Sequence, residues 1–187
     1  TSPLSTGAYL LGKFLSGVAA PGLVTAVLAA ATTAAFLLNG TGPLDPVGLF
    51  GPFLLFTLPA AAVVAAAGVL TETTGPLRGT LGTVLYVFAA FVFIALGVQG
   101  MLPFDLTGLS VLQASMTADV ATQFEASDPT SGFAYVPAGG ETTSFRWSGI
   151  NWTVARLLDR LAAVGVAVAL LLAAAVSFDR FDPDTEI

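Results

Sequence analysis

The sequence predicts an all-α membrane protein, a polytopic helix bundle whose chain crosses the bilayer about four times. Four long stretches contain no charged side chain, namely 14–44, 46–71, 79–104 and 161–178. A spanning helix needs roughly 20 mostly apolar residues, because the hydrocarbon core is about 30 Å thick and a helix rises about 1.5 Å per residue. The chain is also 55% hydrophobic and 10% charged, which would leave a soluble protein too few polar side chains to cover its surface.

The spans are expected to be helices and not strands. In hydrocarbon only helices and closed barrels satisfy the backbone N–H and C=O groups. A barrel would show alternating strands of about ten residues, whereas runs such as 23–38 and 81–98 are almost continuously apolar. Residues 1–187 are therefore predicted to form one transmembrane domain.

The first half of the chain divides at its polar links. Residues 1–13 form a polar to amphipathic lead-in, 14–38 form the first span, and 39–47 are mostly turn residues. The second span covers 48–70, and its many alanines offer a small-residue face on which neighbouring helices can approach closely. The link 71–79 holds Glu72 and Arg78.

The second half contains a third span at 80–99, a long loop at 100–152, a fourth span at 153–178 and a short acidic tail at 179–187. The loop is mixed in polarity and is not expected to cross the bilayer. One helix is expected inside it, because apolar residues recur at three- and four-residue steps and form a stripe that could rest on the bilayer: Leu109, Leu112, Met116 and Val120.

Four spans put both ends of the chain on the same side of the membrane. The basic residues divide equally between the two faces, so their distribution does not orient the protein. Two glycosylation sequons, at 39–41 and 151–153, lie on the same face as the long loop. We therefore expect a multi-pass protein of the cell membrane with an extracytoplasmic loop at 100–152 and with residues 1–13 and 179–187 in the cytoplasm.

Composition excludes several kinds of chemistry. The chain has no Cys and no His, so thiol chemistry, imidazole bases and the usual zinc ligands are missing. No ionisable side chain lies mid-span, and only threonines stand out there: Thr25, Thr32, Thr33, Thr57 and Thr83. We expect no catalytic residues, no metal, no cofactor and no enzymatic activity. Twelve acidic residues against six basic ones argue against nucleic acid and suggest a halophilic source.

Three charged residues near the start of the last span form a candidate site. Arg156, Asp159 and Arg160 lie at helical spacing, which favours an interfacial ion pair, with the arginine side chains reaching out to the membrane surface. A functional gate is the alternative interpretation.

Several short motifs carry a resemblance to a known family. Residues 1–5 (TSPLS) followed by 9–13 (YLLGK) are similar to the cytoplasmic segment of ABC-2 type transporter permeases, in which Arg often follows the Ser; here Thr6 and Gly7 follow it. Residues 70–72, 77–79 and 81–86 match the next cytoplasmic link, and 178–183 resemble a recurrent tail of archaeal members.

The resemblance implies the last four spans of a six-span permease, which would account for the absence of an initiator Met. It also implies an exporter that works with an ABC ATP-binding subunit and a second permease copy. The segment that would couple to the ATPase comprises Pro3, Leu4, Ser5, Tyr9, Leu10, Leu11, Gly12 and Lys13, and the second cytoplasmic link contributes Glu72 and Arg78.

Two other classes of function stay open at this point. The chain could be a membrane anchor or sensor whose loop binds a ligand or partner outside the membrane. In that case the segment 9–13 would have no partner to contact. An intramembrane enzyme is disfavoured, because His, Cys and mid-span carboxylates are all absent.

Overall fold

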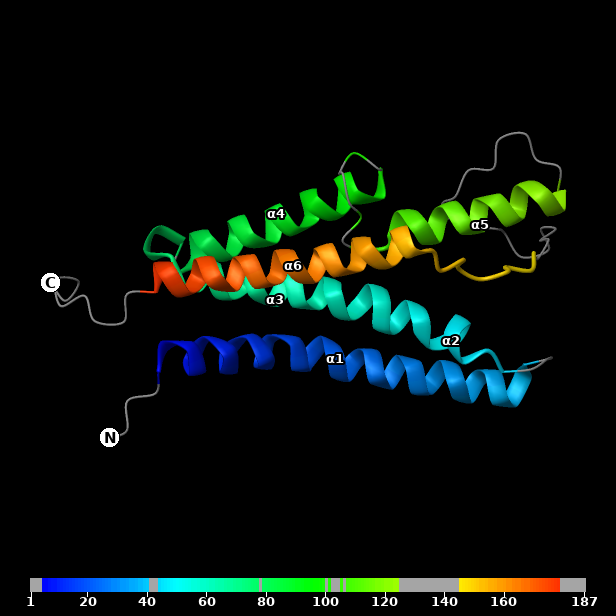
Figure 1. The fold of residues 1–187 in the computed structure, drawn as a ribbon, viewed down its shortest axis with the longest axis horizontal. Helices are drawn as coiled ribbons and strands as arrows, with labels where there is room; N and C mark the ends of the chain where they lie inside the picture. The colour runs from blue at the N-terminus through cyan, green and yellow to red at the C-terminus, as the bar shows by residue number, and fades with distance from the viewer. Residues whose placement is uncertain are drawn as a thin grey trace, which may run out of the picture.

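The computed structural model describes residues 5–40, 44–77, 79–99, 101, 105, 107–124 and 145–178. This part of the chain is built from helices joined by short irregular segments, with no strand among the described residues. The helices run side by side along the long axis of the molecule (Figure 1). The predicted all-α fold class is confirmed.

Four helical segments are long and apolar enough to cross a membrane. They are α1 (Thr6–Asn39), the continuous segment Pro46–Thr73, α4 (Thr80–Val98) and α6 (Val154–Ser177). Each contains most of one predicted span. The protein is therefore a multi-pass membrane protein.

The second spanning segment contains a local change of helix type. It consists of α2 (Pro46–Pro52), a π-helix η1 (Phe53–Thr57) and α3 (Leu58–Thr73). Asp45 caps its start, since the Asp45 carboxylate accepts a hydrogen bond from the Val47 amide at 3.0 Å. The π-helix lies between Pro52 and Pro59, which both lack the amide hydrogen that a regular α-helix uses. A π-turn inside a helix is rare and is often found at functional sites.

The bundle is centred on α3, which packs most extensively against α6 and then against α1. Small side chains line these contacts: Ala61 and Ala66 on α3, and Ala163, Ala167 and Ala174 on α6, are all buried. Small residues let helix backbones approach closely in membranes, where dispersion contacts drive association. The predicted small-residue face is therefore present in the structure.

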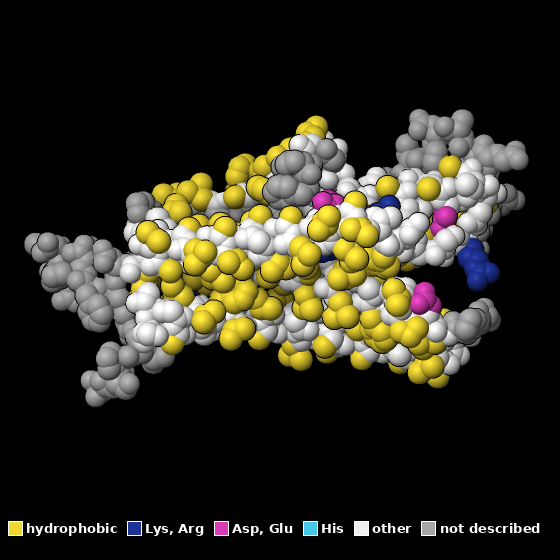
Figure 2. Space-filling view, viewed as in Figure 1, with side chains coloured by type: hydrophobic (Ala, Val, Ile, Leu, Met, Phe, Trp, Pro, Cys, Tyr) yellow, Lys and Arg dark blue, Asp and Glu magenta, His cyan; other side chains and the backbone are white. Residues whose placement is uncertain are grey.

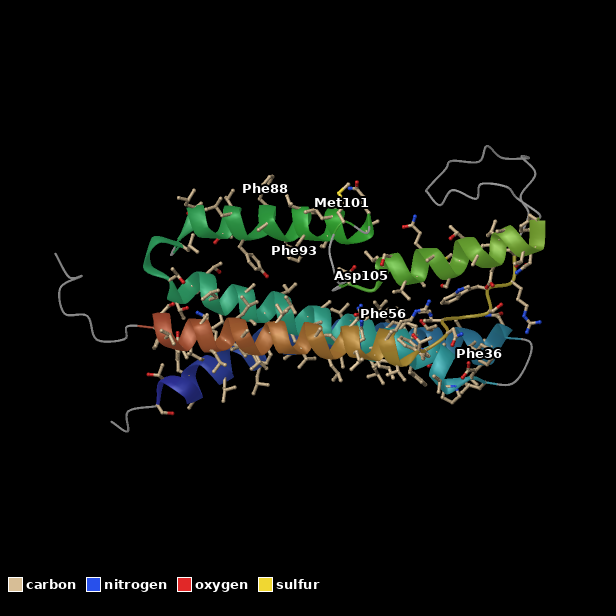
Figure 3. All side chains as sticks on the ribbon, turned by 45° about the horizontal axis from the view of Figure 1, so that its top comes forward. Phe36, Phe56, Phe88, Phe93, Met101 and Asp105 are labelled. Atoms are coloured by element: carbon tan, nitrogen blue, oxygen red, sulfur yellow. The ribbon has the colours of Figure 1, made fainter. Side chains whose placement is uncertain are left out.

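Helix α4 lies on the outside of the bundle (Figure 1). A 3₁₀ turn, η2 (Gly75–Leu77), precedes it, and the Tyr86 hydroxyl donates a hydrogen bond to the Val64 carbonyl of α3 at 3.0 Å. Most of its large side chains are exposed. Phe88 points away from the rest of the bundle, whereas Phe93 points toward it (Figure 3). Hydrophobic side chains cover the bundle along its length, and the charged groups seen on this face lie toward one end (Figure 2).

Helix α5 (Leu109–Phe124) lies beyond the end of α4, and residues 145–150 run back beside it (Figure 1). One face of α5 holds this returning segment. The Trp147 indole donates to Ser115 Oγ at 3.2 Å, and the Ser148 amide donates to Asp119 at 2.6 Å. A third contact, the Arg146 amide to Gln123 at 2.9 Å, continues the row. The predicted loop helix thus exists, and its polar face is the one that binds the returning chain.

The two ends of the molecule carry different parts of the chain. The first and last described residues, Ser5 and Phe178, lie at one end, which we call the N-terminal end; the opposite end carries α5 and is called the α5 end (Figure 1). An even number of spans predicts this arrangement. Residues 1–4 and 179–187 lie outside the described part of the chain.

Candidate functional site

The N-terminal end holds a small core shared by three spans. Leu10 of α1, Val69 of α3 and Ala174 of α6 are each at most 4% exposed. Four partly buried side chains pack around them, namely Phe14, Leu70, Leu171 and Phe178. Leu10, one of the predicted coupling residues, therefore ties the start of α1 to the ends of α3 and α6.

Polar and aromatic contacts surround this core. The Lys13 ammonium forms an ion pair with the Glu72 carboxylate, and it lies 6.0 Å from the centroid of the Tyr9 ring. The Tyr9 ring stacks on Phe178 at a centroid distance of 5.4 Å. The structure thus brings together four predicted site residues, Tyr9, Leu10, Lys13 and Glu72, although 59 positions separate the last two.

The other side of the same segment faces outward. Tyr9 is 41% exposed and Leu11 is 55% exposed, and Gly12 is exposed between them and Lys13. Ser5 caps the helix, since its hydroxyl accepts a hydrogen bond from the Ala8 amide at 3.3 Å. Pro3, Leu4 and Arg78, the remaining predicted residues of this group, lie outside the described residues.

The segment differs from its predicted form in one respect. A separate lead-in was expected at residues 1–13, but residues 6–13 are the first turns of α1, a single helix of 34 residues. The Ser5 cap starts the helix just after Pro3, and no proline interrupts it before Pro21. The segment is therefore rigidly continuous with the first span.

Toward the α5 end, an arginine is buried in the bundle. Arg160 of α6 is 3% exposed. One terminal nitrogen, Nη2, donates a hydrogen bond to the backbone carbonyl of Asp105. The Arg160 guanidinium carbon lies 5.1 Å from the centroid of the Phe56 ring, within range of a cation–π interaction. Its other terminal nitrogen, Nη1, is buried and has no hydrogen-bond partner among the described residues.

This position corrects the interpretation of the three charged residues. An ion pair of Asp159 with Arg156 or Arg160 was predicted, and no such pair occurs in the described part of the chain, where Lys13–Glu72 is the ion pair found. Arg156 donates instead to the Asn151 carbonyl, and Arg160 points into the bundle. The reason is tertiary: the backbone around Asp105 and the Phe56 ring offer Arg160 partners that helical spacing does not show.

Asp105 itself organises the start of α5. One of its carboxylate oxygens accepts hydrogen bonds from the Thr107 and Gly108 amides at 3.0 and 2.8 Å, and the other accepts the Ser110 amide at 2.9 Å. The hydroxyl of Ser110 donates at 2.6 Å. Burial alone would raise the pKa of this carboxyl, but the hydrogen bonds outweigh burial and hold the pKa below its ordinary value.

Phe56, in the π-helix, connects these parts. Its ring lies 5.3 Å from the Trp152 ring, centroid to centroid. Gly108 also packs directly against Phe56, and a Cβ there would collide with the Phe56 ring. Gly51 lies against Trp152, at 3.0 Å from the nearest indole atom to a Cβ built on the glycine. Because Gly108 and Gly51 have no side chains, the Phe56 and Trp152 rings can pack closely against the backbone in this region.

Four of the five mid-span threonines use their hydroxyls in hydrogen bonds to the backbone four residues earlier. The hydroxyls of Thr25, Thr32 and Thr33 donate to the carbonyls four residues earlier, at 2.7 to 2.8 Å, as helix hydroxyls commonly do. Thr83 does the same at 3.2 Å. These four side chains offer no donor to a ligand in this arrangement.

Comparison of the chain with protein-family models, with characterised protein sequences and with solved structures gave no match. Function is therefore argued from the residues and their geometry.

Sequence reasoning missed the aromatic and glycine residues around Arg160. Phe56, Gly108 and Trp152 come from three separate segments, so no local pattern unites them. Asp105 had a usable signal, because an Asp followed by Thr and Ser at short spacing before an apolar run is typical of a helix start. Of the three charged residues predicted near the start of the last span, Arg160 is the one that is buried beside Phe56.

Proposed function

We propose that this chain is the membrane-spanning part of a permease subunit of an ABC-2 type transporter, which exports its substrate through the cell membrane. It would work with a second permease copy and with a separate ATP-binding subunit, and would itself hydrolyse nothing. The permease resemblance of residues 1–5, 9–13, 70–72 and 77–86 motivates this proposal.

One observation carries the proposal further. The segment 9–13 is exposed on one side and fixed to the bundle on the other. Tyr9 and Leu11 are 41% and 55% exposed, while Leu10 and the Lys13–Glu72 ion pair bind the same turns to α3 and α6. A subunit that docks on such a segment can move three spans together.

The mechanism follows from this rigidity. Closure of two ATPase subunits would push on the first turns of α1 in each permease copy. Because α1 is a single helix from Thr6 to Asn39, with Pro21 inside it, the push would be carried along this helix toward the α5 end. A rigid-body shift of packed helices would then open or close the path between the two copies.

A second candidate function is a membrane anchor or sensor. The observation in its favour is the unit formed by α5 and residues 145–150, which is held by hydrogen bonds from Trp147, Ser148 and Arg146. An anchor would not need the exposed residues of segment 9–13. The two functions therefore differ in what contacts the N-terminal end.

The test is affinity purification of the protein from gently solubilised native membranes, with mass spectrometry of what remains bound. We expect an ABC ATPase, and we expect its loss when Tyr9 and Leu11 are both changed to Ala. The matched control changes Leu157 and Leu158, two exposed leucines near the start of α6. Purification without an ATPase, under conditions that keep known transporters assembled, would favour the anchor or sensor.

A further inference from the structure

A pocket of about 240 Å³ lies at the α5 end, between the bundle and the returning segment 145–150. The bundle contributes the end of α1 and the start of α2; the other wall is the chain at Trp147–Gly149. The lining consists of Phe36, Leu44, Asp45, Gly48, Leu49, Trp147, Ser148 and Gly149. The volume is below the roughly 300 to 1,000 Å³ of pockets for drug-sized ligands, so its occupant is small.

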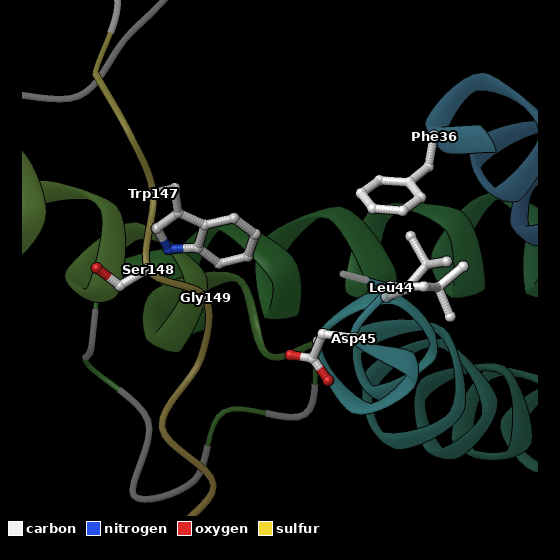
Figure 4. Close-up of a pocket in the computed structure, with 8 residues that line it drawn as sticks. Phe36, Leu44, Asp45, Trp147, Ser148 and Gly149 are labelled. Atoms are coloured by element: carbon white, nitrogen blue, oxygen red, sulfur yellow. The ribbon is translucent and has the colours of Figure 1, made fainter. Parts of the chain in front are cut away.

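Two aromatic residues, Phe36 and Trp147, lie on opposite sides of this space. Figure 4 shows Phe36 and Trp147 on opposite sides, with the Asp45 carboxylate between them and below. The Trp147 indole nitrogen is engaged with Ser115 of α5 at 3.2 Å, so the indole is fixed in orientation and its benzene ring turns toward the pocket (Figure 4). Two of the lining side chains are therefore aromatic, and the hydrogen bond to Ser115 fixes the orientation of one of them, Trp147.

The charge of the pocket is negative. Asp45 is its one ionisable lining residue. The Oδ1 atom of Asp45 accepts the Val47 amide, and within the described residues no hydrogen bond is given to Oδ2. A second carboxylate lies just behind the wall, since Asp119 binds the amide and hydroxyl of Ser148 at 2.6 and 3.2 Å. Arg146 is exposed and is not part of the lining.

A glycine leaves room for the free carboxylate oxygen. A Cβ at Gly48 would lie 2.5 Å from Asp45 Oδ2, which is closer than non-bonded atoms approach. Any larger residue at this position would turn the carboxylate away. The absence of a side chain at Gly48 thus keeps Oδ2 beside the pocket.

From these features we infer that the pocket binds a small monovalent organic cation with an alkylammonium group. Aromatic faces attract such a cation through their quadrupole, and cages of this kind are used to bind quaternary ammonium groups. The Asp45 carboxylate supplies the opposite charge without a competing lining cation. The site goes beyond the proposed transport function and does not depend on it, because binding needs no ATPase.

The test is a titration of the complete chain, ¹⁵N-labelled and in maltoside micelles, with choline chloride at constant ionic strength. The chain contains two tryptophans, so the spectrum has two indole N–H signals, one from each tryptophan. We expect the Trp147 signal to move in a saturable way, with a Kd on the order of 1 mM, while the signal of Trp152, packed on Phe56, stays in place. The uncharged isostere 3,3-dimethyl-1-butanol is expected to leave both signals unmoved.

Variants separate binding from folding. Asp45→Asn and Gly48→Ala should each weaken choline binding about tenfold or more, although alanine favours the helix that it joins. Asp159→Asn removes an exposed acidic group outside the pocket and should keep binding. Equal affinity in Asp45→Asn, an equal response to the neutral isostere, or no saturable shift would overturn the inference.

A lipid headgroup and a free solute can both present an alkylammonium group to the pocket. Nanodiscs of two different lipids distinguish these two sources. If the occupant is a headgroup, phosphatidylcholine discs alone will shift the Trp147 signal and added choline will change nothing further. If the occupant is a free cation, phosphatidylglycerol discs will respond to choline as the micelles do. A Trp147 signal that is the same in both discs, and unmoved by choline in both, would contradict the site.

Discussion

Gly108→Ala tests the packing of α5 on the bundle. The residue has a φ of +78°, and the left-handed region costs a residue with a side chain about 1 to 2 kcal/mol. The new Cβ would also collide with the Phe56 ring, and overpacking of this kind costs typically about 1 to 3 kcal/mol. Together these effects should lower the free energy of unfolding by about 2 to 5 kcal/mol, measured by denaturant titration in micelles.

Gly149→Ala is the matched control for this prediction. Gly149 has a similar φ of +88° but no atom within 4 Å of a built Cβ, so the backbone cost of about 1 to 2 kcal/mol should act alone. Adding Phe56→Leu should recover part of the Gly108→Ala loss by making room for the methyl group. Equal effects of the two alanine variants, or no recovery with Phe56→Leu, would refute the claim that Gly108 and Phe56 are in contact.

Three further predictions concern contacts between elements. Charge reversal at Lys13 or at Glu72 should cost at most about 1 kcal/mol of stability, since both are exposed in part, and the double reversal should restore it; a larger loss would contradict a surface pair. Asp105→Ala should cost about 0.5 to 2 kcal/mol, because it removes the oxygens that accept the amide hydrogen bonds at the start of α5. The lowered pKa of Asp105 means that this stability is present above about pH 4 and is lost as pH falls through the folded-state pKa. As the pH is lowered below about 4, the melting temperature of the variant should therefore fall less than that of the unchanged protein. Tyr86→Phe removes the hydrogen bond to Val64 and should broaden the α3–α4 distance distribution measured by spin labels; an unchanged distribution would show that other contacts fix α4.

The spanning helices were predictable because their signal is local. Long charge-free apolar stretches are typical of membrane spans, and most of each predicted span lies in a helix. The start of α1 was less predictable: residues 1–13 were expected to form a separate lead-in, whereas the Ser5 cap begins the helix at Thr6.

The contacts within the two ends of the bundle could not be read from sequence, because their partners are distant in the chain. Arg160 and Asp105 are 55 positions apart, whereas helical spacing indicated only that Arg156, Asp159 and Arg160 lie together at the start of the last span. The burial of Arg160 also depends on Phe56, whose position is set by a π-helix between two prolines. A periodicity of 3.6 residues contains no information about such a turn.

The central claim is that segment 9–13 contacts an ATPase, and photo-crosslinking tests it most directly. A photoreactive amino acid is placed at Leu11 or, as the control, at Leu158; the two side chains are 55% and 58% exposed and belong to opposite ends of the bundle. After irradiation of native membranes containing the full-length protein, adducts are identified by mass spectrometry. The account predicts an adduct between position 11 and an ABC ATP-binding subunit, and none at position 158. Adducts of position 11 with lipid alone would contradict it.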